Sequence, residues 1–374
     1  METTGHARLR KFVGQLVFVF ASVAGSTLPA LAAVGIGQDY DILNLPAKQS
    51  PLASKTWLHA ITRAGDRLVA VGHRGHIIYS DDKGETWIQA EVPVRSDLTT
   101  VDFPSPDEGW AAGHEGVILR SKDGGETWTK ELDGYQFNEM SLAHYKKLAQ
   151  DNPDNELYPI LVEEAQFALE QGADRPWYVI HVNQRGEVYA AGAYGLLAVS
   201  YDKKTWVPIL EGVENHDGFN HIFGYARFGE DDFMLVGERG SVWYQPQPNQ
   251  PWKRLSPFYT GSLYTAVIAD DGAVIVSGMR GNTFRSTDKG FTWTEVELPV
   301  AESIISSERL ADGRLVLVSA AGSILVSDDQ GLSFKRVDDE TRWPYTDLIE
   351  VEPGVILLTG RNGVRKLELP NPTR

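Results

Sequence analysis

Four segments of this chain repeat a run of polar side chains with the spacing of a small binding loop. Each reads Ser-x-Asp-x-Gly-x-[Thr/Ser]-[Trp/Phe]. A calcium loop would need several more carboxylates and a terminal Glu, and a phosphate loop would need a following Lys-Ser/Thr and a helix. The sequence has neither, so we expect the Asp to bind the N–H groups of its own turn. The residues with this structural role are Ser80, Asp82, Gly84, Trp87, Ser121, Asp123, Gly125, Trp128, Ser286, Asp288, Gly290, Trp293, Ser327, Asp329, Gly331 and Phe334.

Arginine occupies a second recurring position, inside a Gly-x-x-Gly pattern. Arg74, Arg239 and Arg280 stand third in the pattern, and Arg361 stands one place earlier. A guanidinium group can bind a carboxylate through two parallel hydrogen bonds. Where arginine is missing, the corresponding residues are Glu115, Tyr194 and Ala321.

Two interpretations of these arginines remain open. In the first, each arginine covers its own turn and pairs with a nearby acid such as Glu238. In the second, Arg74, Arg239, Arg280 and Arg361 form a partner-binding surface for carboxylates. Because the whole chain has a net charge of −16, such a surface would be a local positive patch.

The residue types and their spacing do not indicate a metal site, a catalytic site or a nucleotide-binding site. His73, His76 and His114 fall near equivalent turns, but no further His or carboxylate completes a metal-ligand spacing. No Ser-His-Asp arrangement, nucleotide fingerprint or zinc signature occurs. We therefore expect no catalytic residues, no metal and no cofactor.

Composition and charge narrow the class of protein further. The chain of 374 residues is 42% hydrophobic, as expected of a globular protein with a large core. Its net charge of −16 argues against nucleic-acid binding, which needs Lys and Arg for phosphate contacts. The absence of cysteine excludes disulfides and thiolate chemistry.

The N-terminus has the order of a secretory signal peptide. Basic residues precede the apolar run Phe12–Ala24, and small residues at 29–33 provide an Ala-x-Ala cleavage pattern. The apolar run is shorter than the roughly 20 residues that span a bilayer, although an uncleaved anchor remains the alternative. We expect residues 1–32 to be a signal peptide, and residues 33–374 to be an exported protein without a membrane span.

The Gly-x-x-Gly pattern marks an internal repeat. Its first position, a glycine except for Ser319, recurs at residues 72, 113, 192, 237, 278, 319 and 360, mostly 41 residues apart. Apolar runs precede and follow each pattern, which predicts a hairpin of two buried strands with glycine at positive φ. Further turn signals complete four short strands per repeat, the size of a propeller blade.

Seven repeats predict an all-β fold, a seven-bladed β-propeller comprising residues 33–374. The last repeat has only three predicted strands, so we expect residues near 34–45 to add the fourth and close the ring. One interval is 79 residues long. The apolar spacing within 133–176 changes to a period of about four, which predicts a helical insertion between blades two and three.

Two family resemblances rest on these motifs. The Ser-x-Asp-x-Gly-x-Thr-Trp segments resemble the Asp box, or bacterial neuraminidase repeat. The mature chain resembles the photosystem II stability/assembly factor family and its relatives in non-photosynthetic bacteria, over about six of seven blades. The residues that carry this resemblance are the Gly-x-Arg-Gly to Trp patterns at 72–87 and 278–293, the 41-residue spacing and the export signal.

The family resemblance implies a seven-bladed propeller without enzymatic activity that acts as an assembly factor or scaffold for membrane-protein complexes. The insertion at 133–176 departs from the family's pattern and favours a bacterial relative with another envelope complex as its partner; a transporter of the resistance-nodulation-division type is one candidate. We expect a monomer in the periplasm, or in the thylakoid lumen of a photosynthetic organism. The alternative is a carbohydrate-active propeller, since sialidases also carry Asp boxes.

Overall fold

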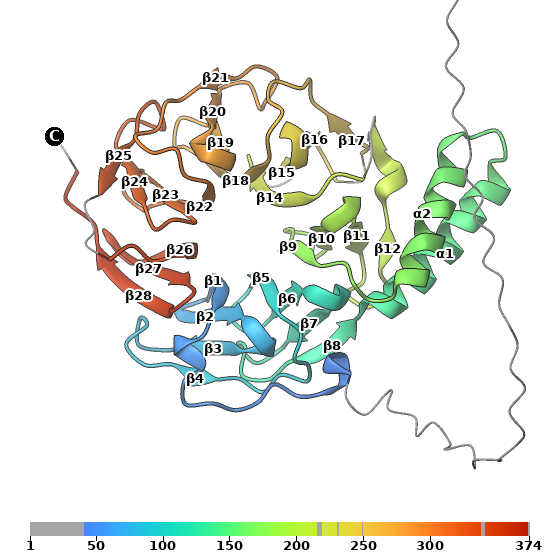
Figure 1. The fold of residues 1–374 in the computed structure, drawn as a ribbon, viewed down its shortest axis with the longest axis horizontal. Coiled ribbons are helices and arrows are strands. Elements are labelled where there is room, and N and C mark those ends of the chain that lie inside the picture. Colours follow the sequence, from blue (N-terminus) through green and yellow to red (C-terminus); the bar gives the residue numbers. More distant parts are fainter. Residues whose placement is uncertain (1–40, 215–218, 230–231, 249, 338–340, 373–374) are drawn as a thin grey trace, which may run out of the picture. The chain divides into compact units, whose positions relative to one another are not determined.

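The expected β-propeller is confirmed by seven small antiparallel sheets arranged around a central axis (Figure 1). The computed structural model describes residues 41–372, with gaps at 215–218, 230–231, 249 and 338–340. The signal peptide expected at residues 1–32 therefore lies outside the described residues. Each sheet is one blade, and its first strand lines the axis.

Blades one to three contain four strands each in the order expected. Blade one consists of β1 (Leu58–Ala64), β2 (Arg67–Gly72), β3 (Ile77–Ser80) and β4 (Ile88–Gln89). Blade two consists of β5 (Leu98–Asp102), β6 (Gly109–Gly113), β7 (Ile118–Ser121) and β8 (Thr129–Leu132). Blade three consists of β9 (Trp177–Val182), β10 (Val188–Gly192), β11 (Leu197–Ser200) and β12 (Val207–Pro208).

Blade four has an additional strand, β13 (Val213–Glu214), which pairs in parallel with β17 at the outer edge of an otherwise antiparallel sheet, so β14 is counted as the first strand of this blade. Its other strands are β14 (Ile222–Arg227), β15 (Phe233–Gly237), β16 (Val242–Gln245) and β17 (Trp252–Arg254). Blade five consists of β18 (Leu263–Ile268), β19 (Val274–Gly278), β20 (Thr283–Ser286) and β21 (Thr294–Glu295). Blade six consists of β22 (Ile304–Arg309), β23 (Leu315–Ser319), β24 (Ile324–Ser327) and β25 (Lys335–Val337). Blade seven consists of β26 (Tyr345–Glu352), β27 (Val355–Gly360) and β28 (Gly363–Glu368).

Second strands form the centre of the core. Every residue of β6, β10, β15, β19 and β23 is buried, because both faces of each sheet pack against neighbouring blades. One apolar cluster joins Val69 and Val71 of blade one to Ala111 and Leu119 of blade two. The apolar runs in the sequence are therefore interfaces between blades.

The expectation that residues near 34–45 form the fourth strand of blade seven is not met by the described part, residues 41–45. These residues begin a segment that follows the outer edge of blade one, where the Arg95 N–H donates to the Ile42 carbonyl at 2.8 Å. The physical reason is burial: Leu43 and Ala47 enter the apolar cluster between blades one and two. Residues 34–40 lie outside the described residues.

Within the described residues, blade seven closes the ring through its inner strand. The Ile61 N–H of β1 donates to Asp347 Oδ2 of β26 at 2.9 Å, and the Thr346 hydroxyl donates to the Leu58 carbonyl at 2.6 Å. Leu58 and Ile61 also share an apolar cluster with Leu357 of β27. Side chains and packing thus join the first and last blades.

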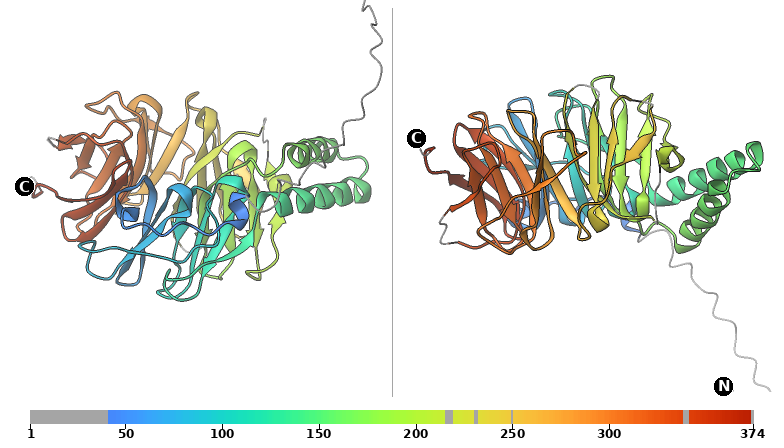
Figure 2. Two further views of the ribbon diagram at one scale, coloured as in Figure 1. Left: turned by 60° about the horizontal axis from the view of Figure 1, so that its bottom comes forward. Right: turned by 90° about the horizontal axis from the view of Figure 1, so that it is seen from above.

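The helical insertion is confirmed as two helices, α1 (Gly134–Asp151) and α2 (Leu157–Gln171). Asp133 caps α1 in a reciprocal pair with Gln136, with both hydrogen bonds at 3.1 Å. Leu142, Leu161 and their neighbours bury an apolar seam between the helices. Figure 2 shows both helices projecting from the rim of the ring. Neither of them is long and apolar enough to cross a membrane, nor is any other helix among the described residues.

Candidate functional site on the turn face of the ring

The two faces of the ring carry different structures. Consecutive strands of a blade are antiparallel, so the turns after second strands and the connections after fourth strands lie on the same face. We call this the turn face, and the opposite face, which carries the turns after third strands, the box face. Because α1 and α2 connect β8 to β9, the insertion also starts from the turn face.

The predicted arginines all lie on the turn face and are exposed. Arg74, Arg239 and Arg280 adopt the left-handed conformation, with φ values of 57°, 57° and 58°. Arg361 occupies the corresponding turn of blade seven. A positive φ is uncommon for residues other than glycine. The backbone therefore fixes the direction in which these side chains leave the ring.

A shared contact sets the geometry of each turn. In blade one, the His73 N–H donates to the Trp57 carbonyl at 2.9 Å, in the connection that leads into β1. A Cβ on Gly72 would stand 2.3 Å from that carbonyl oxygen. In blade one the absence of a Cβ at Gly72 allows this close approach; the φ of Gly72 is −175°, whereas Gly75 has a positive φ of 73°. The positive φ expected of glycine in this turn is therefore confirmed at the second glycine of the pattern.

Carboxylates on the turn face are engaged by other groups. Asp97 Oδ2 lies 2.7 Å from His73 Nδ1, and Asp97 Oδ1 accepts the Arg74 N–H at 2.7 Å. Glu238 Oε2 accepts the N–H of His221 at 3.3 Å and also lies 3.9 Å from Nε2 of that residue. Local donors therefore occupy both of these acids.

The four arginine side chains, in contrast, extend without such partners. Among the described residues, no ion pair or hydrogen bond involves the guanidinium groups of Arg74, Arg239, Arg280 and Arg361. The pairing of Arg239 with Glu238, which the sequence left open, is not formed. Four exposed guanidinium groups on one face can donate hydrogen bonds to the carboxylates of a partner protein.

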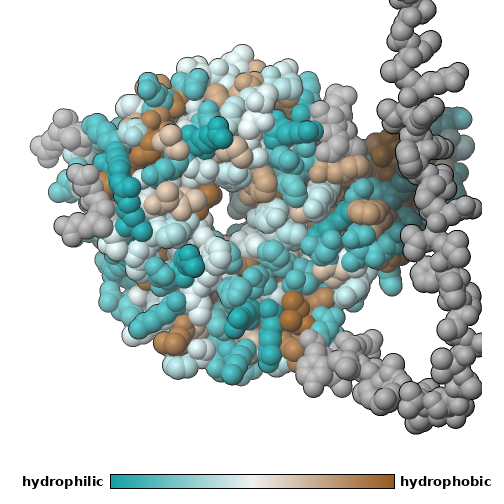
Figure 3. All heavy atoms as spheres, in the orientation of Figure 1, coloured by the Kyte–Doolittle hydropathy of each residue, from teal (hydrophilic) through white to brown (hydrophobic). Residues whose placement is uncertain are grey.

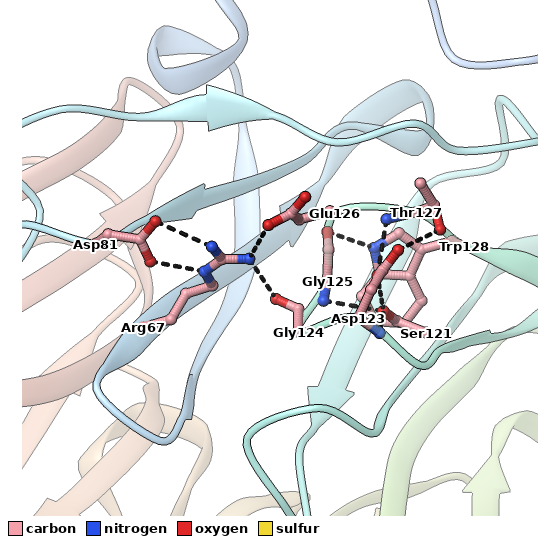
Figure 4. Close-up of polar contacts among 9 residues, drawn as sticks. All are labelled: Arg67, Asp81, Ser121, Asp123, Gly124, Gly125, Glu126, Thr127 and Trp128. Carbon is pink, nitrogen blue, oxygen red and sulfur yellow. Dashed lines mark hydrogen bonds and ion pairs between the residues drawn. The ribbon is translucent and has the colours of Figure 1, made fainter.

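Arginine behaves differently on the box face. Arg67 Nε lies 2.6 Å from Asp81 Oδ1, and Arg67 Nη1 lies 3.0 Å from Glu126 Oε1 and 3.2 Å from the Gly124 carbonyl oxygen (Figure 4). These contacts raise the pKa of Arg67, chiefly through its hydrogen bond with Asp81. Arg67 therefore joins blades one and two and is not free for a partner.

The repeated polar segments of the box face use their side chains internally. In blade two, Ser121 Oγ donates to Asp123 Oδ1 at 2.8 Å and accepts the Gly125 N–H at 2.9 Å. Asp123 Oδ1 also accepts the Thr127 N–H at 3.0 Å, and Trp128 Nε1 donates to the Gly125 carbonyl at 3.0 Å (Figure 4). The Ser, Asp and Gly bonds recur in the turns that begin at residues 80, 286 and 327.

These bonds also favour the ionised carboxylate. The hydroxyl and the N–H of Thr86 donate to Asp82, with a further bond from Ser80, and together they lower the pKa of Asp82 to about 2. The glycine of each turn packs on the preceding blade: a Cβ on Gly84 would stand 2.5 Å from Leu357 Cδ1. The box turns thus stabilise the interfaces between blades.

The histidines singled out in the sequence lie on the turn face but do not form a ligand cluster. His73 contacts Asp97, and His76 Nδ1 lies 3.2 Å from the Thr56 hydroxyl oxygen. In the part of the chain that the structure describes, no group of three or more His, Asp or Glu side chains is placed to hold a metal ion.

A hollow of about 660 Å³ runs along the axis, lined by first strands of all seven blades. Figure 3 shows the ring along this axis with an opening at its centre. Glu308 and Asp347 face this hollow. Burial raises the pKa of Glu308 to about 8, with a smaller contribution from the Asp347 and Glu350 charges, and burial raises the pKa of Asp347 to about 6.

The sequence reasoning missed a group of aromatic residues at the mouth of this hollow. Tyr178, Phe223 and Tyr264 hold the same position in the first strands of blades three to five and line the hollow. Tyr194 holds the turn position that carries arginine elsewhere, and is 48% exposed. A signal was available, because Tyr178, Phe223 and Tyr264 stand 45 and 41 residues apart, at the intervals of the repeat.

Comparison with known proteins adds a family match and several similar structures. The model of one family, described as photosynthesis system II assembly factor YCF48, matches residues 64–135, which run from the end of β1 to the start of α1. Comparison with curated protein sequences gives no match.

Several solved structures share the fold of the whole ring. A structure titled "YCF48 bound to D1 peptide" has a TM-score of 0.62 at 15% identity and covers 89% of this chain and 100% of that chain. YCF48 from Cyanidioschyzon merolae has a TM-score of 0.58 at 16% identity, covering 85% of this chain and 96% of that one. Virginiamycin B lyase from Staphylococcus aureus has a TM-score of 0.63 at 11% identity, covering 87% and 98%.

Because the sequence identities are only 11–16%, the structural similarity shows the fold alone. Propellers with this fold include both assembly factors and lyases. The family match is specific to blades one and two, including their box turns and the turn with Arg74. Blades one and two of this chain are thus similar to the photosystem II assembly factor family, and the whole ring has the seven-bladed propeller fold of the solved YCF48 structures.

Proposed function

We propose that this chain is a non-enzymatic, exported assembly factor that binds a partner protein through the arginines of its turn face. One observation carries the proposal: Arg74, Arg239, Arg280 and Arg361 are exposed and form no ion pair with any described residue, while nearby acids such as Asp97 are engaged. A carboxylate-bearing segment of a partner would find paired donors there in a geometry fixed by the turns.

The comparisons support a polypeptide as the partner. The solved YCF48 structure is titled as bound to D1 peptide, so a propeller of similar fold binds a peptide. For this chain, we propose a partner in or at a membrane complex, for which a transporter of the resistance-nodulation-division type is one candidate. The signal-like residues 1–32 support a periplasmic location, or the thylakoid lumen in a photosynthetic organism.

The turn geometry also supports a role without catalysis. The box turns direct their Ser, Asp and Thr oxygens to their own backbone, so these groups are not available to a substrate. The lyases of similar fold show that the ring alone does not decide activity. A screen with fluorogenic glycosides, one of them a sialoside, should give no turnover; turnover abolished by one Tyr or carboxylate substitution would favour the carbohydrate-active alternative.

Charge reversal tests the binding surface directly. The variant Arg74→Glu, Arg239→Glu, Arg280→Glu should lose partner capture and keep its melting temperature, because Glu115 already occupies the same left-handed turn position in blade two with φ 55°. The matched control reverses three exposed lysines away from the turn face, Lys122, Lys204 and Lys253. Capture that is unchanged in the arginine variant, or equally reduced in both variants, would refute the proposed surface.

A further inference from the structure

Five aromatic side chains form a continuous row from the turn of blade three to the hollow at the ring axis. The Tyr194 ring centroid lies 4.7 Å from that of His221, which stacks on Phe223 at 5.7 Å. Phe223 in turn lies 5.5 Å from Tyr178 and 5.2 Å from Tyr264. We call these five residues the aromatic shelf.

The shelf is accessible from the turn face. Tyr194 is 48% exposed, and the other four residues are half-buried. Tyr178, Phe223 and Tyr264 line the hollow of about 660 Å³. Since pockets for small ligands measure roughly 300–1,000 Å³, this hollow admits a chain terminus or a loop segment but not a folded domain.

A cationic residue, Arg239, borders the shelf. Arg239 follows Glu238, whose N–H donates to the carbonyl of the shelf residue His221 at 2.9 Å. The turn that carries Arg239 packs on the start of β18, where Tyr264 lies. An aromatic surface and a guanidinium that pairs with no described residue are thus neighbours on one face.

From this arrangement we propose that the aromatic shelf is a specificity subsite, which takes an apolar or aromatic side chain of the same partner segment whose carboxylates bind the turn-face arginines Arg239 and Arg280. The proposal rests on the proposed function and deepens it by naming the chemistry of the partner. Aromatic rings supply contact area at low entropic cost, and the Tyr hydroxyls suit a site that stays partly wet.

The charge of the chain favours a polypeptide segment over a lipid surface. The net charge of −16 opposes approach to an anionic bilayer, whereas a single carboxylate beside an apolar side chain needs only the local cations. The occupant is therefore an acidic polypeptide segment with an apolar anchor, presented as a chain end or an exposed loop.

A library of random peptides with free carboxyl termini, panned on the purified protein, tests this inference. The shelf variant is Tyr178→Thr with Tyr264→Thr, because Thr99 and Thr346 occupy the same strand position in blades two and seven. The arginine variant is Arg239→Glu with Arg280→Glu. Melting temperatures within a few degrees of that of the unmodified protein establish that both variants fold; if the shelf variant does not fold, Tyr194→Ala replaces it.

The selected peptides should pair an aromatic or large aliphatic residue with Asp, Glu or the terminal carboxylate. A synthetic peptide of this consensus should bind about tenfold more weakly to the shelf variant and to the arginine variant. If the selected peptides are acidic but show no preference for an apolar residue, and if they bind the shelf variant as tightly as the unmodified protein, the shelf proposal is overturned. The proposed function would then still stand. Peptides unaffected by the arginine variant would contradict the proposed function, and binding to anionic vesicles without any selected peptide would overturn both.

Discussion

The guanidinium carbon of Arg175 lies 5.1 Å from the ring centroid of Tyr194. Arg175 is buried at the end of the insertion, where its Nη2 donates to Glu164 of α2 at 2.7 Å. Tyr194 is the first residue of the aromatic shelf, so the insertion supports the shelf from outside the ring. The two helices therefore start from the same face as the exposed arginines, and α2 helps to position Tyr194 on that face through Glu164 and Arg175.

Replacing Arg175 by Lys should weaken binding of an aromatic-containing peptide about fivefold, because lysine keeps a charge near Glu164 but loses the planar contact with Tyr194. Binding of a matched peptide with Ala in place of the aromatic residue should not change. Titration of both peptides by fluorescence anisotropy separates these effects. Equal weakening for the two peptides would indicate a general structural defect and refute the positioning role.

Gly72 allows close packing between the turn of blade one and the chain that leads into this blade. Gly72→Ala should lower the free energy of unfolding by about 1–3 kcal/mol, since its Cβ would stand 2.3 Å from the Trp57 carbonyl oxygen. Gly212→Ala is the matched control, because a Cβ there meets nothing within 4 Å. Urea titration measures both. Equal free energies of unfolding for the two variants would show that the turn accommodates the added Cβ without loss of stability.

The box turns should contribute to stability and not to binding. Asp123→Ala removes the acceptor of the Ser121 hydroxyl and of the Thr127 N–H, and we expect it to lower the free energy of unfolding by about 1–2 kcal/mol. Lys122→Ala, at the exposed neighbouring position, should have no measurable effect. An intact unfolding midpoint with lost partner binding would instead place a functional site on the box face.

Glu308 makes stability depend on pH. Its pKa is raised to about 8 by burial and by Asp347 and Glu350, against the opposing effect of Arg63 and Arg309. The folded state thus holds this proton more tightly than the unfolded chain, whose Glu pKa is about 4.3. The contribution of this proton to the free energy of unfolding is complete below a pH of about 4.3, and it is lost as the pH rises through about 8.

The variant Glu308→Gln should therefore be more stable than the unmodified protein at pH 9. Its stability should also fall less between pH 5 and pH 9 than that of the unmodified protein. Melting temperatures across this range measure the effect, with Glu295→Gln on the outer strand β21 as an exposed control. Parallel pH profiles for the unmodified protein and Glu308→Gln would contradict the prediction.

The repeat made most of the fold predictable from the sequence. Glycine pairs and apolar runs at a constant interval specify the blades locally, and a change of period specified α1 and α2. The position of residues 41–45 was not predictable, because the burial of Leu43 depends on a groove that exists only after blades one and two have packed. The repeat interval connects Tyr178, Phe223 and Tyr264 in the sequence, but the interval does not show that Phe223 lines the axis and is not part of the core between blades.

Site-specific photocrosslinking in intact cells tests the central claim that the turn face binds the partner. A photoreactive phenylalanine replaces an exposed apolar residue on the turn face, Tyr194 or Met279, or on the box face, Phe291 or Leu332. We predict that positions 194 and 279 give an adduct with the same polypeptide, that Arg239→Glu with Arg280→Glu abolishes this adduct, and that positions 291 and 332 give none. An adduct formed from the box face alone, or one that persists in the arginine variant, would contradict the account.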